Sequence, residues 1–230
     1  MRTTKTCTVF LFLGAFLFFG AGSVKASTAF DLQLAPADPG AGGFLVVSAP
    51  FLHNHLEYSF GFASNYGYRP LELSIRNTDS GNEISATLVE HRLELALSGV
   101  LGLWGIADLG VVLPLLLQSG FDAEAVGASG VDLGTTSISG LEVGNLYLYP
   151  RFQLLEFFNG GFRASVLSLI TLPLGDKTGF VHEAGVVFEP RLVIGGRTNT
   201  MVFSGYLGYR HRFAGPQTIG PLSIENEITL

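Results

Sequence analysis

Acidic and basic residues recur at alternate positions inside apolar stretches of the chain. Glu90, Arg92 and Glu94 follow this pattern within one stretch. Such groups can form ion pairs, line a pore that selects solutes by charge, or act as acid and base in catalysis. Charges of the same kind elsewhere are Asp108, Arg151, Arg163, Glu189, Arg191, Arg210 and Arg212. Which of these roles they have depends on the elements that position them.

The histidines give no sign of a catalytic or metal site. The chain has five: His53, His55, His91, His182 and His211. No Ser-His-acid spacing emerges around them. His53 and His55 alternate like two metal ligands, but no third ligand is evident. The glycines at 40–43 lack the Lys-Ser/Thr of a phosphate-binding loop. We therefore predict no catalytic residue, no metal and no cofactor.

The alternation around Glu90 predicts a strand with two different faces. Over residues 84–98, one face is mainly leucine and the other carries Glu90, Arg92 and Glu94. Three adjacent charges do not fit a dry soluble core, but they fit the wet or ion-paired lumen of a barrel whose other face meets lipid. The residues predicted to face the lumen are Glu90, Arg92, Glu94, Asp108, Arg151 and Arg163. A structural ion-pair network and a solute-selective lining both remain open.

The same patterning predicts eight long antiparallel strands. Their expected ranges are 55–68, 84–98, 107–117, 139–155, 161–173, 182–193, 200–213 and 222–230. Most exceed the roughly 9–11 residues needed to cross an outer membrane as a tilted strand. The connections at 99–103, 156–160 and 194–199 are short, and those at 118–138, 174–181 and 214–221 are generally longer. This asymmetry is typical of short periplasmic turns and longer outer loops.

The N-terminus predicts secretion. Residues 1–26 combine Arg2 and Lys5 with an apolar run at 9–19 and small residues before a cleavage point after Ala26, as in a signal peptide. Cys7, the only cysteine, precedes the apolar run, so a lipid-carrying cysteine is not expected. Cleavage would remove three of the 13 cations and none of the 19 acidic residues, which leaves 10 against 19, a net charge of −9. Nucleic acid is therefore not an expected partner.

Composition favours a membrane barrel over other secreted classes. Hydrophobic residues make up 47% of the chain and charged residues 14%, against about 25% charged in ordinary soluble domains. After residue 26, no segment has the roughly 20 apolar residues of a transmembrane helix. A chain this apolar must satisfy its backbone polar groups in another way, and in lipid that way is a closed barrel. We expect one barrel domain at 55–230, preceded at 27–54 by a periplasmic lead-in or partial plug.

Aromatic residues beside the short turns predict a membrane interface. Trp104, Phe157 and Phe158 lie next to two of these turns. We interpret them as a periplasmic aromatic girdle, with ordinary core packing as the alternative.

Several motifs resemble one family of barrels. They are the segments at 35–40, 66–71, 89–93, 113–120, 144–151, 172–176 and 207–210. These resemble the N-terminal barrel region of deltaproteobacterial OmpA-family outer-membrane proteins and, more distantly, the channels grouped with phenol-degradation transporters. The chain departs from the family pattern at Asn145, Arg151 and Leu174, where Asp, Lys and Thr are usual. The stretch at 220–230 resembles a mid-barrel strand, which implies a truncated barrel with further strands to follow.

These observations predict an outer-membrane barrel that acts as an envelope component or a passive channel for small solutes. Its expected partners are outer-membrane lipid and the barrel-assembly machinery. Two alternatives remain. One is a barrel enzyme of the outer membrane, and the other is a soluble secreted β-sandwich or lipocalin-like binding protein.

Overall fold

The computed structural model describes most of the expected barrel region. The described residues are 37–40, 47–76, 83–120, 139–158, 161–174, 183–215, 217–219, 222–224 and 226–230. The predicted signal peptide at 1–26, His182 and most of the long loop predicted at 118–138 lie outside them.

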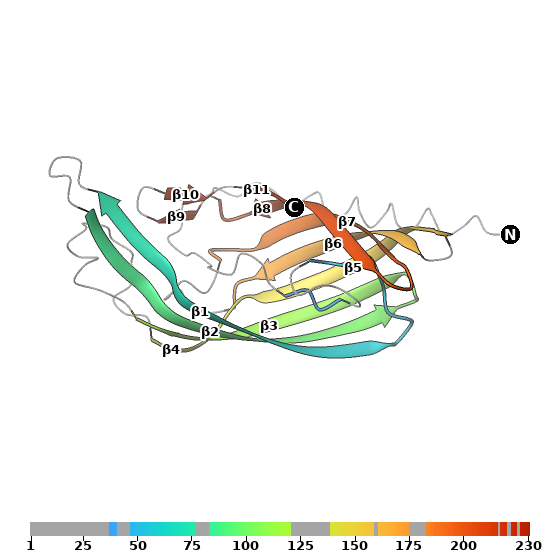
Figure 1. Ribbon diagram of the computed structural model, residues 1–230, viewed down its shortest axis with the longest axis horizontal. Helices are drawn as coiled ribbons and strands as arrows, with labels where there is room; N and C mark the ends of the chain where they lie inside the picture. Colours follow the sequence, from blue (N-terminus) through green and yellow to red (C-terminus); the bar gives the residue numbers. More distant parts are fainter. Residues whose placement is uncertain are drawn as a thin grey trace.

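Eight strands form one antiparallel sheet in chain order (Figure 1). They are β1 (Tyr58–Arg76), β2 (Glu83–Leu103), β3 (Ala107–Ser119), β5 (Leu146–Phe157), β6 (Phe162–Leu172), β7 (Val187–Arg197), β8 (Val202–Arg212) and β11 (Glu227–Thr229). Strand β4 (Ser139–Val143) pairs with the end of β3, and β9 (Gln217–Ile219) pairs with β10 (Leu222–Ile224) in a separate hairpin. The predicted all-β, up-and-down antiparallel architecture is confirmed. Among the described residues, no helix has both the length and the apolar character needed to cross a membrane.

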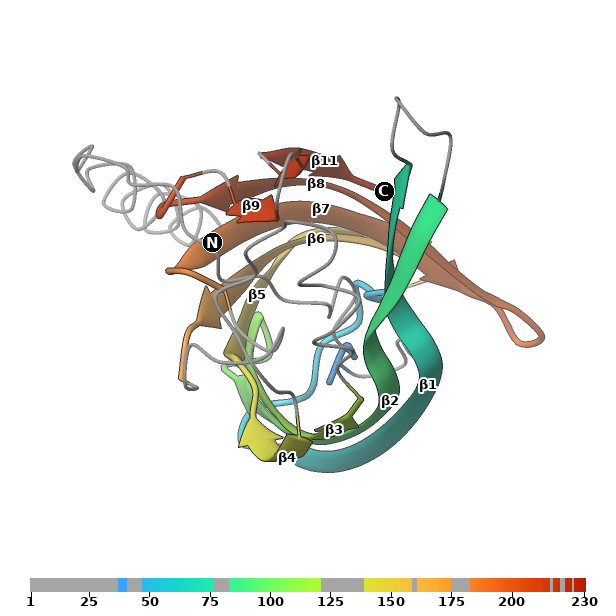
Figure 2. The ribbon, with the colours of Figure 1, turned by 90° about the vertical axis from the view of Figure 1, so that its left-hand side faces the viewer.

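Viewed end on, the sheet curls into a half-barrel (Figure 2). Strands β1 and β11 are the two edges of the described sheet. Because each neighbouring pair is antiparallel and the path contains eight strands, these two edges run in opposite directions. That is the relative direction that closure of an antiparallel barrel requires.

The two faces of the sheet differ, since buried charges lie on one face and exposed large apolar side chains lie on the other. On β2, Arg92 and Glu94 are each 7% exposed, whereas Leu97 and Leu101 are 47% and 37% exposed. The buried face is the inside of the curl, because Gly102, on the same side of β2, lies against residues 53–54. The apolar side chains that cluster on this inner face are Ala96, Val112, Tyr147, Tyr149, Leu167, Leu169 and Val193.

Strands β1 and β2 extend beyond their predicted ends. The first strand was expected to stop at residue 68, but β1 continues to Arg76 because the pairing with β2 shifts register on both sides of Leu71. This irregularity accommodates Pro70, which cannot donate to a ladder. A turn was expected at 99–103, but β2 runs through Gly99 and Gly102 to Leu103. Gly102 serves close packing there rather than a turn.

Two expected strands are divided. The strand expected at 139–155 is β4 and β5, separated by Gly144 and Asn145. The amide of Gly144 donates to the Pro114 carbonyl at 2.9 Å, so the interruption is a local bulge against β3. The strand expected at 222–230 is β10, which pairs with β9, and β11, which pairs with β8.

The register of β2 against β3 can be tested with cysteine pairs. Ser98 lies opposite Val112, and directly opposed Cβ atoms are about 4.5–5.5 Å apart. We expect Ser98→Cys with Val112→Cys to form a disulfide in a Cys7→Ser background. Leu116 faces the same side but lies four residues further along β3, about 13 Å away, so Ser98→Cys with Leu116→Cys is the control. Non-reducing mass spectrometry measures both, and efficient bridging of the control pair instead would contradict this register.

Candidate functional site

A segment that precedes the first strand lies inside the curl of the sheet (Figure 2). We call its described parts, residues 37–40 and 47–57, the inner segment. Residues 27–54 were predicted to be a lead-in or partial plug. The inner segment contacts side chains of β3, β5 and β8, so strands far apart along the sheet share it as a common partner.

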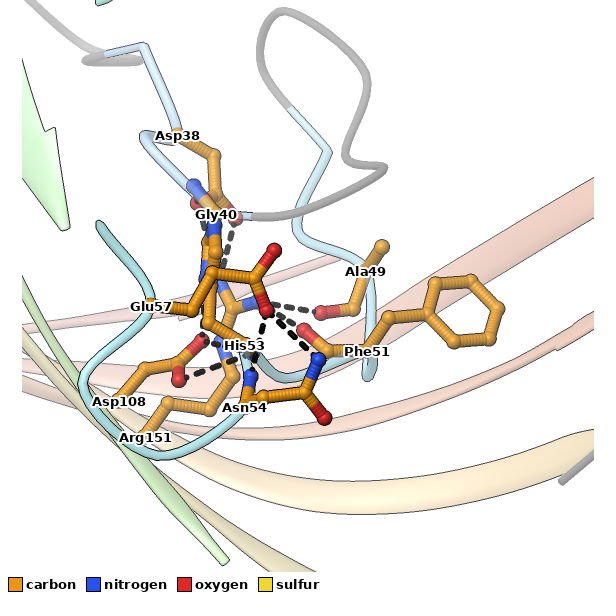
Figure 3. A network of polar contacts seen from close by, with 9 residues as sticks. All are labelled: Asp38, Gly40, Ala49, Phe51, His53, Asn54, Glu57, Asp108 and Arg151. Atoms are coloured by element: carbon orange, nitrogen blue, oxygen red, sulfur yellow. Dashed lines mark hydrogen bonds and ion pairs between the residues drawn. The ribbon is translucent and has the colours of Figure 1, made fainter. Parts of the chain in front are cut away.

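Arg151 of β5 is the main anchor of the inner segment (Figure 3). Its Nη2 donates to both carboxylate oxygens of Asp38, at 2.9 and 3.0 Å, and its Nη1 donates to the carbonyls of Ala49 at 2.7 Å and Phe51 at 3.3 Å. The Arg151 and Asp38 side chains are 2% and 1% exposed. Only arginine presents a planar fork of donors that can hold a carboxylate with two bonds and reach two carbonyls as well. Removing one partner of such a buried pair typically costs about 3–5 kcal/mol.

Asp108 of β3 holds the other end of the inner segment. Its carboxylate accepts the backbone N–H of His53 at 3.1 and 3.3 Å and lies 3.2 Å from the His53 ring Nδ1. Asp108 and Arg151 are register partners on adjacent strands. Two opposite charges therefore stand side by side on the barrel wall, and each is directed to a different part of the inner segment (Figure 3).

Neutral side chains and glycines complete the contact. The Tyr149 hydroxyl donates to the Ala37 carbonyl at 3.2 Å, and Ser204 Oγ donates to the Ser48 carbonyl at 2.5 Å. Gly110 and Gly195 leave room for prolines of the inner segment. A Cβ at either position would lie 2.9 Å from a proline carbon. The wall is thus shaped to fit the segment closely.

A tight turn joins the inner segment to β1. The Asn54 backbone and side-chain N–H groups both donate to the Glu57 carboxylate at 2.8 Å. The bond from the Asn54 backbone, and to a smaller extent the bond from its side chain, hold the pKa of Glu57 below its ordinary value. The backbone ladder with β2 then begins at Gly102. The Leu56 amide donates to the Gly102 carbonyl, and the Gly102 amide donates to the Glu57 carbonyl.

A second charge cluster lies on the inner face of β7, β8 and β11. Glu189 is fully buried and accepts from Arg191 Nε at 2.7 Å, Arg210 Nε at 2.8 Å and Thr229 Oγ1 at 2.7 Å. The Arg191 guanidinium also lies over the Tyr206 ring, 4.6 Å from its centroid. This cluster ties three strands together through one carboxylate.

The residues predicted to face the lumen fall into two groups. Asp108, Arg151 and Arg163 lie beside the inner segment, since the Arg163 guanidinium is 5.8 Å from the Phe51 ring centroid. Arg163 is half-buried and also lies 3.6 Å from Glu156. Arg92 and Glu94 are buried and lie 3.9 Å from each other. Glu90, on the same side of β2, is half-buried.

The residues predicted as a girdle lie at the end of the sheet that carries the short turns. Trp104 is 70%, Phe157 48% and Phe158 89% exposed. A second aromatic group, missed from the sequence, lies level with the opposite ends of β3 and β8, while β1 and β2 continue beyond it. There the Tyr66 hydroxyl lies 2.7 Å from His91 Nδ1, and the His211 ring packs edge-on against Phe213. Aromatic residues at alternate positions, as at 66 and 68 and at 209, 211 and 213, were the signal that could have located it.

His53 and His55 have separate partners. His53 contacts Asp108, whereas His55 Nδ1 accepts the backbone N–H of Trp104 at 3.1 Å. Within the described ranges, no three His, Cys, Asp or Glu side chains are grouped to hold a metal ion. Asp38, Tyr149 and Ser204 are site residues that the sequence did not indicate, because their role depends on where the inner segment lies.

The close approach of the inner segment to Gly102 can be tested by adding one methyl group. A Cβ at Gly102 would collide with the Asn54 carbonyl oxygen and lie 2.8 Å from the His53 Cβ, whereas a Cβ at Gly205 would meet nothing within 4 Å. We expect Gly102→Ala to lower the free energy of unfolding by about 1–3 kcal/mol and Gly205→Ala to leave it nearly unchanged. Urea titration of both variants in detergent measures this, and equal stabilities would argue against the close contact.

Comparisons with known proteins do not identify a relative. No protein-family model, no curated protein and no solved structure matches the chain. The resemblance to OmpA-family barrels therefore stays a prediction, and the function has to be inferred from the geometry of the two faces and of the inner segment.

Proposed function

We propose that this protein is an outer-membrane β-barrel that serves as an envelope component or as a passive channel for small solutes. The observation that carries the proposal is that charges are buried on the inner face while large apolar side chains are exposed on the outer face. Arg151 and Glu189 are buried on the inner face, at 2% and 0% exposure, while large apolar side chains cover the outer face. In lipid this distribution is favourable on both sides, because the apolar face meets hydrocarbon and the charges pair inside.

The outer face carries a broad aliphatic band. Its exposed members include Leu97, Leu109, Val111, Leu117, Leu141, Leu154, Leu155, Leu192, Ile194 and Leu207. They come from strands all around the curl. A soluble monomer rarely exposes a continuous apolar surface larger than a few hundred Å². The band therefore favours a membrane protein over the soluble β-sandwich or lipocalin-like alternative.

Aromatic side chains border this band at both ends of the sheet. Phe203 lies at one end of β8 and Phe213 just beyond the other, and both are about half exposed. Their separation of ten residues corresponds to about 33 Å of strand. At a tilt of about 40°, this is about 25 Å along the barrel axis, close to the apolar height of outer-membrane barrels. Aromatic rings at both borders fit the two membrane interfaces.

The open edges of the sheet are compatible with this proposal only if they are paired in the membrane. Hydrocarbon does not tolerate exposed backbone donors and acceptors. The opposite directions of β1 and β11 permit an antiparallel closure. The predicted signal peptide and the OmpA-like motifs support placement in a Gram-negative outer membrane.

Membrane integration is tested by fractionation. We expect the full chain, expressed with its own N-terminus in a Gram-negative host, to sediment with the outer membrane on a sucrose gradient. It should stay in the membrane during a carbonate wash and dissolve only with detergent. Recovery in the detergent-free periplasmic fraction would reject the proposal and favour a soluble secreted protein.

The depth of the apolar band is tested by arginine substitutions on one face of β2. Leu97 lies near the middle of the band, and His91 lies at the aromatic border on the same face. An arginine facing lipid costs about 2–4 kcal/mol at the midplane and about 0–1 kcal/mol near an interface. We therefore expect Leu97→Arg to reduce folding into lipid vesicles much more than His91→Arg. Heat-modifiable migration on gels measures the folded fraction.

Glu94→Gln provides the inward control for this comparison. Its change of charge lies on the buried face, so folding into vesicles should fall less than for Leu97→Arg. The assigned orientation of β2 is wrong if Leu97→Arg folds like the parent while Glu94→Gln does not.

A further inference from the structure

We propose that the inner segment is a displaceable gate, and that the adjacent pair Asp108 and Arg151 is its latch. This inference rests on the proposed barrel function. It assigns to the same site a means of controlling the passage of small hydrophilic solutes. Three features of the described residues lead to it.

The first feature is how the inner segment is held. The hydrogen bonds described between the wall and residues 37–40 and 47–53 come from wall side chains, namely Asp108, Tyr149, Arg151 and Ser204. Backbone pairing with β2 begins only at Leu56 and Glu57. A segment held by a few side chains can leave without breaking the sheet, whereas one held in a ladder cannot. The attachment at 56–57 would then act as the hinge.

The second feature is the turn at that hinge. The Glu57 amide donates to the Asn54 carbonyl at 3.1 Å, and Leu56 has a φ of 62°. A non-glycine residue in this left-handed region is held there by its surroundings. The local bonds of Asn54 to the Glu57 carboxylate close the turn without using the wall. The turn can therefore persist while the residues before it move.

The third feature is that the latch has a second arrangement. With the gate in place, Arg151 binds Asp38 and Asp108 binds His53. Asp108 and Arg151 are opposed across β3 and β5, so their Cβ atoms lie within about 5.5 Å of each other. If the inner segment leaves, the two can pair with one another. In the described part of the chain, Arg151 Nε has no acceptor, so a donor is already available for this exchange.

This exchange of partners removes the main obstacle to gating. A buried charge that loses its only partner is strongly destabilised, which would keep the gate closed permanently. Here each wall charge loses a partner on the gate and gains the other wall charge. The two arrangements can then be close in free energy, as a two-state switch requires.

Single-channel recording tests the gate. The full chain is purified, folded in detergent and inserted into planar bilayers in potassium chloride. We expect rare openings in the native chain. Asp38→Asn weakens the bond between the inner segment and Arg151 and leaves the latch residues themselves unchanged. It should raise the open probability by about tenfold or more, since a hydrogen bond to a charged group is worth that much. Glu72→Gln is the control, because it removes the same charge at an exposed site on β1 that faces Arg69.

A cysteine pair gives an independent test. Ser204 Oγ bonds the Ser48 carbonyl, so Ser48→Cys with Ser204→Cys in a Cys7→Ser background should link the inner segment to β8. We expect the oxidised form to show no openings. Dithiothreitol should bring openings back at a frequency at least that of the native chain, because Ser204→Cys also removes one bond that holds the inner segment. This pair leaves Asp38, Asp108 and Arg151 unchanged, so it decides the matter even if Asp38→Asn fails to assemble.

The outcomes separate the gate from the barrel itself. A chain that inserts stably, with equal open probability in the native and Asp38→Asn forms and no effect of the disulfide, would overturn the gate and leave the barrel proposal standing. A chain that does not insert, and is washed from membranes by carbonate, would overturn the barrel proposal on which the gate rests.

Discussion

The buried guanidinium of Arg151 is the group on which the interior of this protein depends. A charge on the inner wall of a curled sheet is tolerated only when it is paired with an opposite charge and most of its N–H groups have acceptors. Asp38, Ala49 and Phe51 provide them, and all three come from chain that precedes the first strand. The position of the inner segment and the packing of the inner wall therefore depend on each other.

The neighbouring elements follow from this interaction. Asp108 stands opposite Arg151 in the β3–β5 register and binds the inner segment at His53. Gly102 and Gly110 lack side chains where the segment crosses β2 and β3. Charge and shape on three strands thus match one irregular segment, although that segment shares little regular structure with the sheet.

The outer face obeys a different requirement. Its aliphatic band and aromatic borders stay largely exposed, so they contribute most to stability in an apolar surrounding. The inner charges have the opposite need, since they are stable only when paired and shielded. The same strands meet both needs because successive side chains of a strand point to opposite faces. This division of the two faces supports the proposed place of the protein in a membrane.

The sequence by itself determined the strands and their two faces. The alternation of Arg92 and Glu94 with leucines is local information, and a strand converts it directly into an inner and an outer side. The all-β fold followed from repeated patterns of this kind. The strand ends were less predictable, because glycine and proline usually indicate turns. Gly102 and Pro70 lie within strands here for reasons that depend on their tertiary neighbours. The division of the last predicted strand between β10 and β11 likewise depends on pairing partners outside that segment.

Only the tertiary structure decided the partners of the charges. Asp38 and Arg151 are separated by 113 positions, and no pattern near either residue indicates that they meet. The proline and glycine residues of the lead-in excluded regular structure but did not show where it lies. Its place is set by the curl of the sheet, which brings β3, β5 and β8 around one volume. Contacts across such a volume depend on how all the strands pack together. Patterns among residues close in the sequence therefore do not reveal them.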